Sequence, residues 1–174
     1  MPIGLVVPLR VATFMAALLT TLAEPGAAVA GSTGATPAST APGITTINGK
    51  VPPGRVQAAQ VTRLLRVTLE SGEVLYQYRT VRPAGTRAPI HRHPYGGSTC
   101  VIQGETTMRI EGKPGAITHR AGTCFYMPPG PVMANFNSGT MPFITLDSFI
   151  LKTGQKPMEV VEPGHAHIEG EFKR

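Results

Sequence analysis

Short stretches of alternating apolar and polar residues, separated by turn signals, are the feature that most constrains how this chain folds. Two of them, residues 64–69 and 74–81, flank a turn and are rich in β-branched and aromatic side chains. Further stretches follow at residues 98–103, 106–110, 116–120, 124–127, 132–136 and 143–151. Turn signals recur about every 8–12 residues, which is typical of an all-β sandwich or barrel. No convincing amphipathic helix interrupts the pattern.

The N-terminal residues differ in character from the rest. Residues 1–30 combine Arg10, an apolar run and the small residues Ala28 and Ala30, which together predict a secretory signal peptide cleaved after Ala30. Residues 31–48 are dominated by Gly, Ser, Thr, Ala and Pro and predict a flexible linker. We expect one folded domain over residues 49–168, a tail over residues 169–174, and a periplasmic or secreted location without membrane association after cleavage.

The charge of the chain is positive but dispersed. The formal net charge is +6 at pH 7, and the arginines are scattered rather than clustered. A nucleic-acid-binding surface normally needs a basic stripe or patch. The sequence therefore argues against a nucleic-acid partner and favours a small molecule.

The pair His91 and His93 is the strongest chemical signal in the sequence. Residues two apart on a strand point to the same face, so both imidazoles enter one cavity. Histidine is the commonest metal ligand in proteins, and the pair therefore favours a metal site. However, residues 85–104 contain no Asp or Glu to supply a carboxylate ligand.

Two spaced motifs carry a family resemblance. Eight positions are in register with them: Gly85, His91, His93, Gly104, Gly122, Pro128, Gly130 and Asn137. Over residues 64–151 the chain resembles the cupin superfamily, in particular small single-domain proteins of the cupin-2 type. The resemblance implies an all-β, double-stranded β-helix (jelly-roll) barrel.

The resemblance also shows which metal ligands are replaced. A typical metal-binding cupin holds its ion with three His and one Glu, and this chain has Gly97 and Met133 at two of those positions. Gly97 cannot bind a metal, whereas the thioether of Met133 is a weak ligand that favours soft ions such as Cu(I). Asn135 lies on the same strand face as Met133 and is a further polar candidate.

Three interpretations of this site compete. In the first, His91 and His93 form a reduced metal centre for Fe, Mn, Ni or Cu in a dioxygenase-like or isomerase-like enzyme, with Cu favoured if Met133 is a ligand. In the second, the pocket is metal-free and the histidines transfer protons. In the third, the protein is a non-catalytic module that binds a small ligand or copper. An open sheet edge would also allow a homodimer.

Cys100 and Cys124 leave three alternatives open. The barrel topology that the resemblance implies places them on neighbouring strands, where they can form a disulfide, as expected in an oxidising compartment. They can also be two buried thiols, or Cys100 can supply a thiolate ligand.

Several other residues are candidates for the cavity. Tyr95 follows the histidine pair, and either Phe125 or Tyr126 should face inward, so we expect Tyr95 and Tyr126 to contribute to the cavity or its rim. Met127 is a candidate lining residue. Three further histidines are candidates for a missing ligand: His119, His165 and His167. The last two lie in a polar segment that we expect to be solvated.

Overall fold

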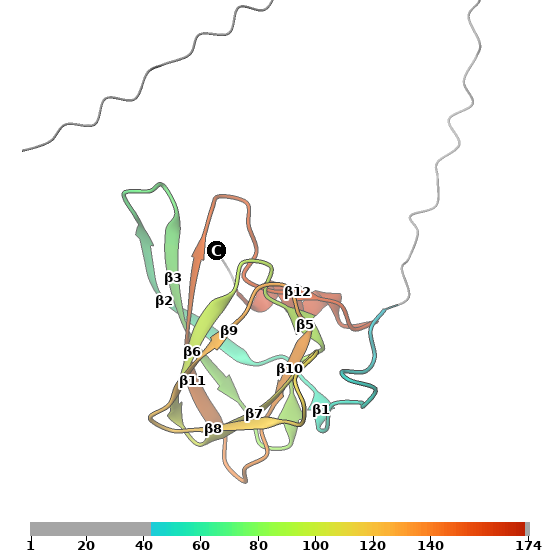
Figure 1. Ribbon diagram of the computed structural model, residues 1–174. Helices are drawn as coiled ribbons and strands as arrows, with labels where there is room; N and C mark the ends of the chain where they lie inside the picture. The colour runs from blue at the N-terminus through green and yellow to red at the C-terminus, as the bar shows by residue number, and fades with distance from the viewer. Residues whose placement is uncertain (1–42, 173–174) are drawn as a thin grey trace, which may run out of the picture. The chain divides into compact units, whose positions relative to one another are not determined.

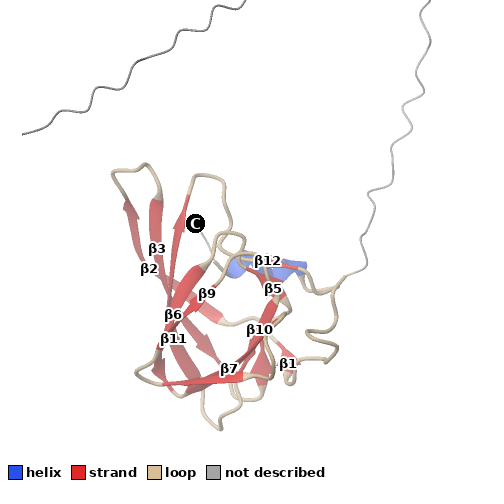
Figure 2. Cartoon of the chain, in the orientation of Figure 1, coloured by secondary structure: helices blue, strands red, loops and turns tan. Residues whose placement is uncertain are grey.

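The computed structural model describes residues 43–172, which are built almost entirely of β-strands (Figure 2). One short helical segment, the 3₁₀-helix η1 (Ala166–Glu171), occurs in that part of the chain. The all-β prediction is confirmed. The predicted signal peptide and residues 31–42 of the predicted linker lie outside the described residues.

Two sheets enclose the interior of the domain (Figure 1). The first sheet is antiparallel and has the spatial order β2 (Gln60–Thr68), β3 (Val74–Arg82), β11 (Phe143–Leu151), β6 (Gly97–Gln103) and β9 (Cys124–Met127). The second has the order β1 (Arg55–Val56), β4 (Thr86–Arg87), β10 (Met133–Phe136), β5 (His91–Arg92) and β12 (Glu159–Val160). In addition, β7 (Glu105–Ile110) pairs with β10, and β8 (Ile117–Arg120) pairs with β7. This arrangement is a double-stranded β-helix.

Alternation along β3 and β11 determines what faces the interior. Every second residue of both strands is buried, as expected when one face of a sheet covers the core. Antiparallel pairing places Tyr76 opposite Phe149 and Thr80 opposite Thr145. The inward positions are therefore apolar where β3 begins and β11 ends, and mostly polar towards the other end.

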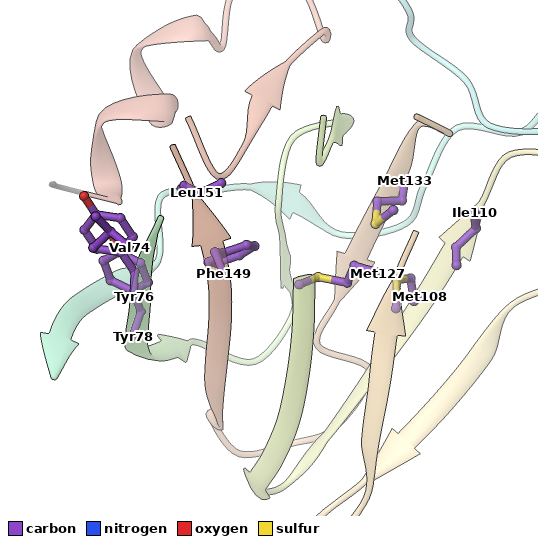
Figure 3. Packing of buried hydrophobic residues seen from close by; sticks show 9 residues of the cluster. All are labelled: Val74, Tyr76, Tyr78, Met108, Ile110, Met127, Met133, Phe149 and Leu151. Carbon is purple, nitrogen blue, oxygen red and sulfur yellow. The ribbon is translucent and has the colours of Figure 1, made fainter. Parts of the chain in front are cut away.

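The main hydrophobic cluster fills the apolar part of the barrel (Figure 3). It consists of Val74, Tyr76, Tyr78, Met108, Ile110, Met127, Met133, Phe149 and Leu151. A second cluster contains Ile47, Ile90, Val132 and Ala134. Because these residues come from both sheets, they hold the two layers together around the site described below.

The motif residues outside the histidine pair shape the backbone. Gly104 separates β6 from β7 with φ of 72°, a left-handed conformation that glycine adopts without strain. The buried Asn137 side chain donates hydrogen bonds to the carbonyl oxygens of Arg82 (3.0 Å) and Met141 (2.8 Å). These contacts hold the loop that connects β10 to β11.

Both ends of the described chain pack against the barrel, where the sequence predicts a flexible linker and a tail. The predicted linker extends to residue 48, yet Ile47 is fully buried in the second cluster, and the Ile44 amide donates to the Val161 carbonyl (3.1 Å). The predicted tail begins at residue 169, yet the Phe172 ring packs against Tyr78. Both predictions rely on the polarity of each segment as a whole and miss its single large apolar residues. No helix within residues 43–172 has the length and hydrophobicity needed to span a bilayer.

Candidate metal centre

The barrel interior contains a cavity of about 50 Å³ to which both sheets contribute. His91 and His93 line it, and both are almost completely buried. Their ring centroids lie 5.0 Å apart, with the ring planes nearly perpendicular. The structure therefore brings the two predicted ligands together, and Arg92 between them faces solvent.

A backbone carbonyl fixes the tautomer of each imidazole. Nδ1 of His91 donates to the carbonyl of Pro89 (2.7 Å), and Nδ1 of His93 donates to the carbonyl of Pro157 (2.6 Å). A carbonyl oxygen can only accept, so Nδ1 carries the proton in both neutral rings and Nε2 keeps its lone pair. Metal-binding histidines are oriented in this way by the hydrogen bond of the second nitrogen.

Burial keeps both rings neutral. Desolvation lowers the pKa of His91 to about 3, the charge of His93 lowers it further, the hydrogen bond to Pro89 opposes the change, and the charge of Arg82 makes the smallest lowering contribution. Desolvation also lowers the pKa of His93 to about 4, against the hydrogen bond to Pro157. Neutral imidazole is the form that binds metals, so no proton has to be displaced near neutral pH.

An aromatic ring fills the position where a carboxylate ligand would stand. A Cβ atom added to Gly97 would lie 2.6 Å from both Cδ1 and Cε1 of Phe149 and 3.1 Å from Cε of Met127. The same Phe149 ring stacks on the His93 ring at a centroid distance of 5.4 Å. The site therefore has no room for a side chain at residue 97. Residues 43–172 hold no group of three or more His, Cys, Asp or Glu side chains that would suit a metal ion.

Methionine side chains line the same cavity as the two histidines. Met133 is buried and lies directly opposite His91 on the neighbouring strand, an arrangement that brings Cβ atoms within about 4.5–5.5 Å of each other. Four methionines line the cavity: Met108, Met127, Met133 and Met158. Such a donor set fits a soft ion better than a hard one.

The positions of the two motifs decide the family resemblance. His91 on β5 and His93 just beyond its end line the interior, Met133 lies on the neighbouring strand β10, and Gly104 and Asn137 lie in the turns that follow β6 and β10. The chain has the double-stranded β-helix fold that the resemblance to cupins implies. The strand order and these motif positions carry that assignment.

Comparisons with known proteins give similarity only at the level of solved structures. No family model matches the sequence. No curated protein matches it either.

Three solved structures illustrate the similarity. The DMSP lyase DddQ from Ruegeria pomeroyi DSS-3 is 21% identical over 63% of this chain and 53% of its own, with a TM-score of 0.48. A recombinant oxalate oxidase in complex with glycolate is 25% identical over 60% and 55%, with a TM-score of 0.49. An uncharacterized conserved protein with a double-stranded β-helix domain from Klebsiella pneumoniae is 24% identical over 67% and 89%, with a TM-score of 0.47. The chain thus spans about half the length of the first two.

The other predicted cavity residues have mixed outcomes. Asn135 lines the cavity. Tyr95 and Tyr126 do not line it and are 49% and 63% exposed, so the structure differs from our prediction for both. Period-2 alternation on β9 turns Phe125, rather than Tyr126, towards the interior.

Cys100 and Cys124 are directly opposite each other on β6 and β9 and form a disulfide. A thiolate ligand from Cys100 is therefore not part of this site.

The remaining histidines do not complete the coordination. His119 stacks on Phe125 (4.0 Å between centroids) and does not line the cavity. His165 and His167 do not line it either, although their segment covers one side of the cavity through Ile168 and Phe172. The segment that follows β12 thus lines the cavity with Ile168 and Phe172 and with neither of these imidazoles.

One buried acid was not predicted from the sequence. Asp147 on β11 lines the cavity, is 7% exposed, and accepts hydrogen bonds from the hydroxyls of Thr80 (2.5 Å), Thr99 (2.7 Å) and Thr145 (3.3 Å). Burial raises the pKa of Asp147, and the three hydroxyls and the charge of Arg82 oppose that change. Period-2 alternation is the signal that could have found it, because it places Asp147 on the same face as Phe149.

Proposed function

We propose that this cupin binds a small molecule at a metal centre formed by His91 and His93, with Met133 as third ligand and Cu(I) as the preferred ion. The observation that supports it most is the pair of buried, neutral imidazoles whose Nδ1 atoms are both held by backbone carbonyls. This leaves two Nε2 lone pairs for one ion.

The composition of the cavity supports the choice of ion. Imidazole binds Zn, Cu, Fe and Ni, whereas hard ions such as Mn(II) prefer carboxylate and water oxygens. The Phe149 ring excludes a carboxylate at residue 97, while four methionine side chains line the same cavity as the pair. Thioethers select Cu(I), so Met133 and its neighbours favour copper over Fe or Mn.

The protein would contribute orientation and exclusion of water. His91 and His93 hold the ion, which supplies a Lewis-acidic position for an oxygen or nitrogen atom of the ligand. Apolar side chains, including Phe149 and Phe172, shield the cavity and lower its dielectric constant. An exported location is part of the proposal, and a purified mature protein that begins at Gly31 would support it.

Competition with bicinchoninate for Cu(I) under argon tests the proposal. We expect one Cu(I) per wild-type protein. Loss of a residue that only orients a ligand costs about 10–100-fold in metal affinity, so H91A/H93A should lose more than that. The His165→Ala/His167→Ala variant removes the same number of imidazoles outside the cavity and should bind as the wild type does.

Methionine variants separate copper selection from simple imidazole binding. Met133→Leu preserves the volume but removes the sulfur, and we expect weaker Cu(I) binding with Zn(II) binding unchanged. Met141→Leu is the matched control, because Met141 is exposed and does not line the cavity. Equal Cu(I) affinity of H91A/H93A and wild type would overturn the proposal.

A further inference from the structure

Asp147 forms a second polar centre in the cavity. It is the only aspartate in the sequence, and it stands on β11 among the inward-facing residues. The hydroxyl of Thr80 and that of Thr145 donate to Oδ2 (2.5 and 3.3 Å), and that of Thr99 donates to Oδ1 (2.7 Å). All four side chains line the cavity.

Hydroxyl groups, rather than an ion pair, hold this carboxyl group in the cavity wall. Burying a carboxylate is costly unless hydrogen bonds or a counter-ion compensate it. Within residues 43–172, Asp147 takes part in no ion pair. Three strands (β3, β6 and β11) instead supply hydroxyls that hold the acid in the cavity wall.

The position of Asp147 separates it from the metal centre. Asp147 does not form a metal-binding group with His91 and His93, because the described residues hold no such cluster of three. It lies two residues from Phe149, whose ring stacks on His93, and two residues of strand span about 7 Å. Asp147 is therefore the inward-facing residue of β11 next to Phe149, whose ring stacks on His93.

The carboxylate has unused acceptor capacity. Each carboxylate oxygen can accept about two hydrogen bonds. Oδ2 accepts from Thr80 and Thr145, whereas Oδ1 accepts from Thr99 alone. One acceptor position on Oδ1 is left for a group inside the cavity.

We propose that Asp147 binds the hydrogen-bond donor of a small ligand, a hydroxyl or a primary ammonium group, whose other end lies at the His91/His93 centre. The ligand is short, because a cavity of about 50 Å³ holds roughly three or four water molecules. The inference rests on the proposed function for the metal-bound end of the ligand. In this inference Asp147 is the residue that selects ligands with a hydrogen-bond donor at one end.

Three probes of equal length test this selection: butyrate, 3-hydroxypropionate and β-alanine. They share a carboxylate and differ at the far end, which is a methyl, a hydroxyl or an ammonium group. Their dissociation constants are measured by calorimetry under argon with Cu(I)-loaded and metal-free protein, and metal content is determined on the same samples. A hydrogen bond to a charged group corresponds to about tenfold or more in affinity, so at least one donor-bearing probe should bind about tenfold more tightly than butyrate.

Two variants assign the preference to Asp147. Asp147→Asn keeps the shape but turns an amide NH₂ towards the cavity, because Oδ2, with its two threonine donors, is the position for the amide oxygen. We expect the ratio of the dissociation constant of butyrate to that of the donor-bearing probe to fall to about one. Thr145→Val removes only the longest of the three hydrogen bonds and should keep the preference. The wild-type ratio tests the proposal even if Asp147→Asn fails to fold.

The outcomes distinguish this inference from the proposed function. Wild-type protein that binds Cu(I) but discriminates less than twofold among the probes overturns the inference and leaves the metal centre in place. Protein that binds no metal but keeps the donor preference supports the inference and overturns the metal centre. An unchanged preference in Asp147→Asn overturns the role of Asp147.

Discussion

Replacing Gly97 by alanine tests how firmly the aromatic ring occupies the position of the absent carboxylate. The new Cβ atom would lie 2.6 Å from two ring carbons of Phe149 and 3.1 Å from the terminal methyl of Met127. The Phe149 ring is buried, stacks on His93 and packs at a tilt against Tyr78, so it cannot yield without disturbing the core. Overpacking of this kind costs about 1–3 kcal/mol.

The net effect also includes the unfolded chain. Replacing glycine by alanine at a compatible backbone position stabilises a protein by about 0.4–1 kcal/mol, because the unfolded chain loses freedom. We therefore expect Gly97→Ala to lower the free energy of unfolding by about 1–2 kcal/mol in urea titrations. Gly139→Ala is the matched control, because its nearest neighbour would be an ordinary 3.4 Å away.

A double-mutant cycle assigns the effect to the ring. Phe149→Leu alone should cost about 1–2 kcal/mol, since leucine keeps part of the ring volume. In the double variant the two costs should not add, and we expect a favourable coupling of about 1 kcal/mol or more. Gly97→Ala as stable as the wild type, or additive costs, would refute the idea that Phe149 has taken the carboxylate position.

The remaining predictions concern buried charges. In the metal-free protein the pKa values of His91 and His93 are lowered, so below about pH 6.5 the unfolded chain binds up to two more protons than the folded chain. The contribution of the two neutral rings to the free energy of unfolding is therefore complete above about pH 6.5. We expect that free energy to fall by about 2–3 kcal/mol per pH unit between pH 6 and 4.5. Urea midpoints that stay constant from pH 7 to 5 would contradict this. Glu162→Gln should destabilise the protein by about 3 kcal/mol, because it leaves the buried Arg87 without its bidentate partner. Glu159→Gln, in a half-exposed ion pair, should cost less than about 1 kcal/mol in the same thermal and urea unfolding assays.

Local patterns made the fold and the histidine pair predictable. The alternation on β3 and β11 follows from a sheet with one buried face, and it is visible in any strand of that length. The spacing of His91 and His93 and the turn at Gly104 are short-range features, so they could be identified before the strands were placed.

The chemistry around the histidines was less predictable because it depends on contacts between distant strands. The hydroxyls that hold Asp147 come from Thr80 and Thr99, which are 67 and 48 residues away in the sequence. The clash that explains Gly97 involves Phe149 on another strand, and the contribution of Phe172 required a terminal segment to fold back on the barrel. Period-2 counting places a residue on a face, but it does not show which residues meet there.

Anomalous diffraction from crystals of the copper-loaded protein tests the central claim most directly. With both Nδ1 atoms held by the carbonyls of Pro89 and Pro157, the ion must bind through Nε2 of His91 and His93. We predict one strong anomalous peak inside the barrel, bonded to those two nitrogens. Copper found only elsewhere on the protein, or no peak in the cavity after loading, would contradict the account.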